Sequence, residues 1–121
     1  MNILIVESNP HIVEMLRPFL EQACSVASHE ILHAASIQEI GRIIVTEAGI
    51  DLVLCANRLH KAPVGDLLQT LHTAWPNALL CLMSDDHVAP QNHAADIFVE
   101  KVELVKELPE IVDAAKRRMA K

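Results

Sequence analysis

The chain has very few aromatic residues. Only 2% of its 121 residues are aromatic and tyrosine is absent, although 51% are hydrophobic. Leu, Ile, Val and Ala must therefore supply the core, in strands and helices that face each other, and so large a hydrophobic fraction argues against disorder. The length fits one compact domain and leaves no room for a second. Residues 1–121 are therefore expected to form a single domain.

Positive charge is also scarce. Ten Lys and Arg face sixteen Asp and Glu, which gives a net charge of −6 and a pI near 5.5. Binding to the phosphate backbone of nucleic acid relies on clustered Lys and Arg, so no direct nucleic-acid partner is expected. The basic residues that do cluster lie near the C-terminus, where they offset the negative end of a final helix: Lys116, Arg117, Arg118 and Lys121.

Signals for export, membrane insertion and metal binding are missing too. The opening MNILIV has no basic flank, long apolar stretch or cleavage site, so a cytoplasmic protein without a membrane partner is expected. Cys24, Cys55 and Cys81 show no CxxC spacing, which favours buried, reduced thiols over a disulfide between Cys55 and Cys81. No metal site or cofactor is expected from the seven histidines, which are His11, His29, His33, His60, His72, His87 and His93.

Short apolar runs alternate along the chain with segments of helical periodicity. The runs that resemble strands are residues 2–6, 30–34, 51–56, 78–83 and 97–99. Several are continuously apolar, as strands covered on both faces are. Alternating strands and helices predict an α/β fold, in which a doubly wound parallel sheet has helices on both sides.

Local signals place the helices. Asn9 followed by Pro10 supplies an N-cap and a first-turn proline, and Ser36 with Glu39 forms a capping box. Pro18 is expected to kink or shorten the first helix, and Pro109 is taken as the start of the last one. The polar residues 85–94 lack apolar periodicity, so the helix before the last is expected to be short or missing. The expected apolar helix faces are Ile12, Leu16, Phe19, Leu20 and Ala23; Ile37, Ile40, Ile43, Ile44 and Ala48, closed by Gly49; Leu67, Leu68, Leu71, Ala74 and Trp75; and Ile111, Val112, Ala115 and Met119.

Three segments carry a family resemblance. The opening ILIVESNPHIVEMLR, the strand DLVLCANRL and the later ADIFVEK are, in this order and at these separations, similar to the receiver domains of two-component response regulators. The resemblance covers residues 2–101. It implies a flavodoxin-like (βα)5 fold with five parallel strands in the order 2-1-3-4-5.

The resemblance also assigns roles to residues at strand ends. The family's acidic pair falls on Glu7 and Ser8, and its phosphoacceptor aspartate falls on Ala56. The hydroxyl position falls on Ser84, the lysine on Lys101, and the aromatic switch on Phe98. An aspartyl phosphate needs a carboxylate oxygen as nucleophile, which alanine lacks. Glu7 alone is a poor cage for Mg²⁺, which prefers several oxygen ligands.

Neighbouring charges have simple readings. Lys101 is expected to pair with Glu7 across the pocket, with modest net value if the pair is partly exposed. Asp85 and Asp86 follow Ser84 and are expected to be solvated rather than to replace the lost carboxylate. A short basic loop is the best candidate for contact with an acidic partner: Arg58, His60 and Lys61.

These observations predict a pseudo-receiver that is not an enzyme. Such a module would transmit a phosphorelay signal by contacting a kinase, a regulator, an output domain or a second copy of itself. The alternative is a sensor that binds an anion or small molecule in the vacated pocket. A phosphoacceptor at Ser8, Asp51 or Asp85 is the weakest reading, since Ala56 occupies the family position.

Overall fold

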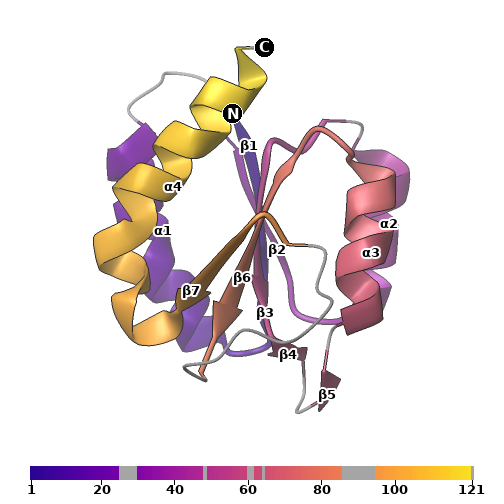
Figure 1. Ribbon diagram of the computed structural model, residues 1–121. Coiled ribbons are helices and arrows are strands. Elements are labelled where there is room, and N and C mark those ends of the chain that lie inside the picture. Colours follow the sequence, from indigo (N-terminus) through magenta and orange to yellow (C-terminus); the bar gives the residue numbers. More distant parts are fainter. Residues whose placement is uncertain (25–29, 48, 60–61, 64, 86–94, 121) are drawn as a thin grey trace.

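Strands and helices alternate along the chain in the computed structural model, which describes residues 1–24, 30–47, 49–59, 62–63, 65–85 and 95–120 (Figure 1). The elements are β1 (Asn2–Val6), α1 (Pro10–Cys24), β2 (Glu30–Ala34), α2 (Ile37–Thr46), β3 (Leu52–Ala56), β4 (Arg58–Leu59), β5 (Ala62–Pro63), α3 (Gly65–Ala74), β6 (Leu79–Ser84), β7 (Ile97–Glu100), the 3-10 helix η1 (Lys101–Glu103) and α4 (Leu104–Met119). Among these described residues no helix is long and apolar enough to span a membrane.

The main sheet has five parallel strands in the order β2-β1-β3-β6-β7. Counted in chain order without the small hairpin, this is the predicted order 2-1-3-4-5, and the prediction of the α/β fold is confirmed. The central strands β1, β3 and β6 are almost wholly buried, which explains their continuously apolar sequences. From β1 the chain passes first to β2 on one side of the sheet and then to β3 on the other side. In α/β proteins, ligands usually bind at such a switch point, outside the carboxyl ends of the two strands, which here are β1 and β3.

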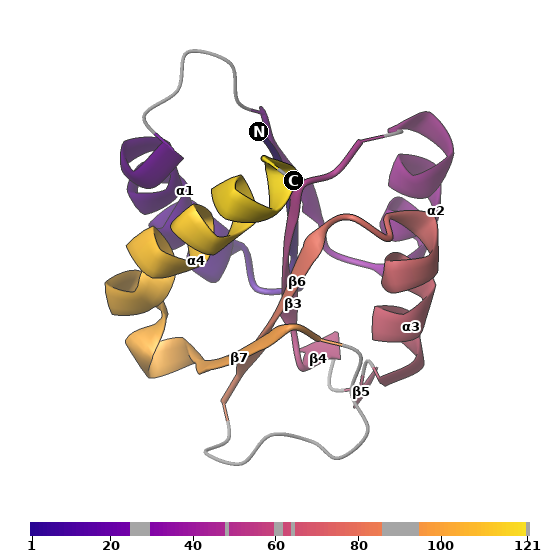
Figure 2. The same cartoon turned by 45° about the horizontal axis from the view of Figure 1, so that its top comes forward.

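Among the described residues, two helices cover each face of the sheet. Figure 2 shows α1 and α4 on one side and α2 and α3 on the other. Ile3 and Ile5 of β1 belong to the cluster on the α1–α4 side, whereas Leu4 and Val6 belong to the cluster on the α2–α3 side. The alternation of strand side chains thus divides the core into two layers.

The predicted helix starts at Pro10 and after Ser36 are both observed. The amide of His11 donates to Asn9 Oδ1 at 3.0 Å, and the amide of Glu39 donates to Ser36 Oγ at 3.3 Å. The Glu39 carboxylate returns to accept from the amide of Ala35, one residue before the position that a standard capping box uses. These side chains satisfy amides that the first turns leave open.

Both helices on the α1–α4 side contain a proline inside. The prediction that the last helix starts at Pro109 is wrong, because α4 begins at Leu104 and passes through Pro109. The buried residues Leu104 and Leu108 extend the apolar stripe upstream, and their packing outweighs the lost backbone bond. Likewise α1 is not shortened at Pro18 and continues to Cys24. Both prolines are exposed, so neither ring disturbs the packing of the helix against the sheet.

Some predicted core positions are exposed. Phe19 is 42% exposed, Ile37 is 69% exposed and Met119 is 49% exposed, because each lies at the margin or end of its helix. Helix α2 also ends at Thr46, earlier than the predicted end near Gly49. Periodicity therefore located the buried stripe of each helix but not its edges.

A short antiparallel hairpin, β4 with β5, follows β3 and was not predicted. Arg58 in β4 is exposed, while His60 and Lys61 lie outside the described residues. The prediction that the helix before the last is short or missing falls on residues 85–94, of which only Asp85 is described. Asp86 also lies outside the described residues.

Candidate functional site

Four predicted site positions lie at the carboxyl ends of four adjacent strands. Glu7 follows β1, Ala56 ends β3, Ser84 ends β6 and Lys101 follows β7. The strand register aligns them, because Val6 pairs with Cys55, Ala56 with Met83, and Ser84 with Glu100. These residues, separated by up to 94 positions in the chain, therefore share one edge of the sheet.

The side chains at this edge divide between the two faces. Ala56 belongs to the cluster on the α1–α4 side, and it is fully buried. Ser84 lies two residues beyond Leu82, which belongs to the opposite cluster, and Phe98 packs partly against that same cluster. Ser84 and Phe98 therefore share the α2–α3 face, and Leu82 is the direct partner of Phe98 in the sheet.

Glu7 is buried and held by several backbone contacts. Only 2% of it is exposed. Its amide donates to the carbonyl of Ala34 at 3.1 Å, and its Oε1 accepts from the amide of Asn9 at 3.2 Å. The ring Nε2 of His33 lies 2.8 Å from the Glu7 carbonyl oxygen. Sequence reasoning did not identify His33 as part of the site. The signal was its position near the end of the second predicted strand, which lies beside the strand that precedes Glu7.

Lys101 meets Glu7 across the site, as expected from the sequence. Its Nζ lies 3.2 Å from Glu7 Oε2 and 3.7 Å from Asp85 Oδ2. The Lys101 side chain is 16% exposed, so its pair with Glu7 is shielded from water, whereas Asp85 is 69% exposed. A single ammonium group thus faces two carboxylates at this edge.

Two buried oxygen atoms at or near this edge lack hydrogen bonds. Neither Glu7 Oε2 nor Asn57 Oδ1 accepts one from any described residue. The contact between Lys101 and Glu7 is therefore an ion pair whose distance is short but whose geometry is not that of a hydrogen bond. Both of these oxygen atoms can only accept hydrogen bonds. An anion bound beside them would bring further acceptors and no donor, so it would not satisfy them.

The residues present do not fit a Mg²⁺ site. Mg²⁺ takes oxygen ligands in near-octahedral geometry, usually including carboxylates. Glu7 already faces the Lys101 ammonium, Ala56 supplies no ligand, and Asp85 is mostly exposed. Over the described part of the chain, no three His, Cys, Asp or Glu residues come close enough to hold a metal ion.

One local sequence has the spacing of a zinc motif. Residues 29–33 read HEILH, which matches the HExxH pattern of metalloproteases. That pattern requires a helix, so that the two histidines lie on one face. Here Glu30–Ala34 is strand β2, and His33 contacts the carbonyl of Glu7 instead. The match therefore has no support in the fold.

Cys55 and Cys81 are buried free thiols, as predicted. They lie on adjacent strands, but Cys55 belongs to the core on the α2–α3 side and Cys81 to the core on the α1–α4 side. Burial raises the pKa of Cys81 to about 12. Burial, and secondarily the nearby Glu7 charge and Cys81, raise the pKa of Cys55 to about 12 as well. These thiols are unsuited to redox chemistry.

Several solved structures of receiver domains are similar to this chain over nearly its whole length. A response regulator receiver domain protein from Clostridium thermocellum is 20% identical with a TM-score of 0.79, and the match covers 98% of this chain and 96% of that one. The signal receiver domain of an HD domain-containing protein from Pseudomonas fluorescens Pf-5 is 20% identical with a TM-score of 0.77, covering 99% and 98%.

A third similar structure is the response regulator TrrA from Thermotoga maritima in complex with Mg²⁺ and BeF, at 22% identity and a TM-score of 0.76, covering 94% of this chain and 97% of that one. No protein-family model and no curated protein sequence matches the chain. At these identities the likeness establishes the fold, which is that of receiver domains.

Proposed function

We propose that this chain is a pseudo-receiver, a two-component signalling module that contacts a protein partner without accepting phosphate. The observation that carries the proposal is Ala56 at the end of β3, where it pairs with Met83, one position before Ser84, and follows Cys55, the partner of the residue before Glu7. A methyl group cannot attack a phosphoryl donor. The module accordingly has no catalytic residue and needs no cofactor.

The charges at the site support this reading over an anion sensor. An anion would need a free cation at the pocket, but Lys101 Nζ already faces Glu7 and Asp85. A ligand could displace that contact only by binding more strongly than the buried carboxylate does. The ion pair thus favours a site with one resting arrangement.

The output surface of the proposed module consists of Phe98, the outer edge of β7 and helix α4. Phe98 occupies the family's switch position, is half-buried, and shares a sheet face with Ser84. In receivers that are phosphorylated, a local charge biases an equilibrium between two conformations. Here that charge has no acceptor, and the surface is expected to keep one conformation.

The test is binding of a partner isolated with the intact gene product from the native host and then purified. Binding should be equal with and without acetyl phosphate and Mg²⁺. Phe98→Ala should weaken it, whereas the control Val45→Ala should not, because Val45 is an exposed hydrophobic residue on α2, on the other face of the sheet from α4. Binding that requires acetyl phosphate, or that is lost only in Ala56→Asp, would contradict the proposal.

A further inference from the structure

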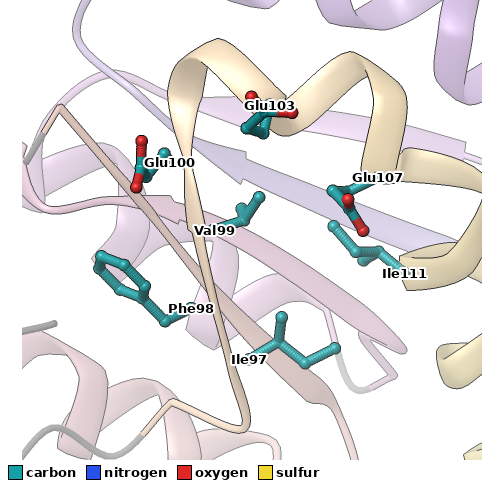
Figure 3. A pocket seen from close by; sticks show the side chains of 7 residues that line it. All are labelled: Ile97, Phe98, Val99, Glu100, Glu103, Glu107 and Ile111. Carbon is teal, nitrogen blue, oxygen red and sulfur yellow. The ribbon is translucent and has the colours of Figure 1, made fainter. Parts of the chain in front are cut away.

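A groove runs between the outer side of β7 and helix α4. Its volume is about 360 Å³, and its lining residues are Ile97, Phe98, Val99, Glu100, Glu103, Glu107 and Ile111 (Figure 3). Strand β7 is the last strand of the sheet, so no other described strand covers this side. The groove is therefore open along an edge of the fold.

The lining combines apolar and acidic side chains. Val99 and Ile111 are almost fully buried and form part of the core beneath, and Ile97 packs against the same core. In Figure 3 the carboxylates of Glu103 and Glu107 come from the helix, while that of Glu100 comes from the end of β7. A segment seated here would place apolar atoms on the floor and polar atoms along the rim.

The charge of the rim has one sign. None of the seven lining residues is Lys, Arg or His. Glu103 forms an ion pair with Lys106 at 4.0 Å, and both side chains are more than half exposed, so this pair neutralises little of the Glu103 charge. The carboxylate of Glu107 has no ion-pair partner within the described part of the chain. Glu103 and Glu107 lie four residues apart on one helical stretch, where like charges disfavour each other, and an incoming cation would offset that effect.

We infer that this groove binds a basic segment of a partner protein, with an apolar residue on the floor and Lys or Arg side chains against Glu103 and Glu107. The inference rests on the proposed function and names the partner class of its output surface. Complementary charge along the rim would speed association and select the partner, while the apolar contact would contribute most of the affinity. The same carboxylates would reject nucleic acid and acidic partners.

The test uses a fluorescein-labelled hexapeptide in which leucine and valine are flanked on each side by two lysines. Binding to the full chain is measured by fluorescence anisotropy, and amide shifts of Ile97, Phe98 and Ile111 are followed by NMR. We expect saturable binding that weakens as salt rises from about 0.05 to about 0.5 M, because screening shortens the reach of exposed charges. A peptide with glutamates in place of the lysines, or with serines in place of leucine and valine, should bind far more weakly.

The protein variants isolate the rim. The double variant Glu103→Gln and Glu107→Gln should weaken binding of the lysine peptide about tenfold, since each exposed charge pair contributes up to a few-fold. The control is Glu14→Gln with Glu21→Gln on α1, which makes the same change of charge at exposed positions outside the groove. Equal weakening in both variants, unchanged binding in the first, or amide shifts confined to other elements would overturn the inference. So would sedimentation showing that a second copy occupies the groove.

Failure here is separable from failure of the proposed function. If the chain takes up no phosphate and its partner binds through Phe98, but the peptide ignores Glu103 and Glu107, only the basic-segment inference falls. If the chain is phosphorylated while the peptide binds as expected, only the phosphate-independent function falls.

Discussion

The Lys101 ammonium lies 3.2 Å from Glu7 Oε2, although their strands are not neighbours. Strands β3 and β6 lie between β1 and β7, and adjacent strands are about 4.8 Å apart. The two side chains therefore meet above the ends of the intervening strands, where Ala56 and Ser84 lie. The ion pair thus joins the first and last of the four strands whose ends form the site.

Removing Lys101 should destabilise the fold. Lys101→Met leaves the buried Glu7 carboxylate without its cation, and we expect a loss of about 3 kcal/mol in the free energy of unfolding, measured by urea denaturation. The control Lys106→Met removes an ammonium that is 80% exposed and should change stability by less than about 0.5 kcal/mol. Equal effects of the two substitutions would show that the Glu7 pair has no special role.

The buried thiols should be unreactive in the native state. Because the pKa values of Cys55 and Cys81 are raised to about 12, almost no thiolate exists at pH 8, and alkylation by iodoacetamide should be slow until urea unfolds the chain. The unfolded thiol has the ordinary pKa of 9.0, so the unfolded state loses its protons first. Stability should therefore fall as pH rises from about 9 toward 12. Rapid alkylation of either residue in the native protein at pH 8 would be inconsistent with this burial.

Mg²⁺ should have almost no effect on thermal stability. A ligand stabilises the folded state only when its concentration exceeds its dissociation constant, and one carboxylate already paired with lysine should not bind Mg²⁺ that tightly. Differential scanning fluorimetry at millimolar Mg²⁺, with Ca²⁺ as the control ion, is the measurement. A rise of several degrees that is specific to Mg²⁺ and disappears in Glu7→Gln would refute the reading of the site.

The first turns of α4 should contribute to the core. Leu108 is fully buried, so Leu108→Ala should lower the free energy of unfolding by about 2–5 kcal/mol. Val102 lies two residues before α4 and is 85% exposed, so Val102→Ala should have an effect below about 0.5 kcal/mol. If α4 began at Pro109 instead, the two substitutions would have similar, small effects.

The sequence was sufficient to predict the strands that are buried on both faces. The continuously apolar runs at β1, β3 and β6 have few alternative structures, and Asn9 and Ser36 cap their helices through local hydrogen bonds. The start of α4 was missed because Pro109 was given more weight than the apolar residues before it. The free-energy cost of a proline inside a helix depends on whether the proline lies on the exposed face, and the sequence alone does not show that.

The candidate site shows a similar limit. The contact of Lys101 with Glu7 was predicted, because a family resemblance aligned both residues with one edge of the sheet. Asp85 was expected to be only solvated, yet it lies within 3.7 Å of the same ammonium. His33 and the acidic groove along β7 were missed, since both arise from strands and helices that are distant in sequence and adjacent only in the fold.

The most direct test of phosphate independence is the intact mass of the protein after incubation with acetyl phosphate and Mg²⁺. We predict no gain of a phosphoryl group, because Ala56 offers no oxygen nucleophile at the end of β3. An active receiver domain treated in parallel serves as the positive control. A labile gain of one phosphoryl group on this chain, mapped to Asp85 or any other aspartate, would contradict the account.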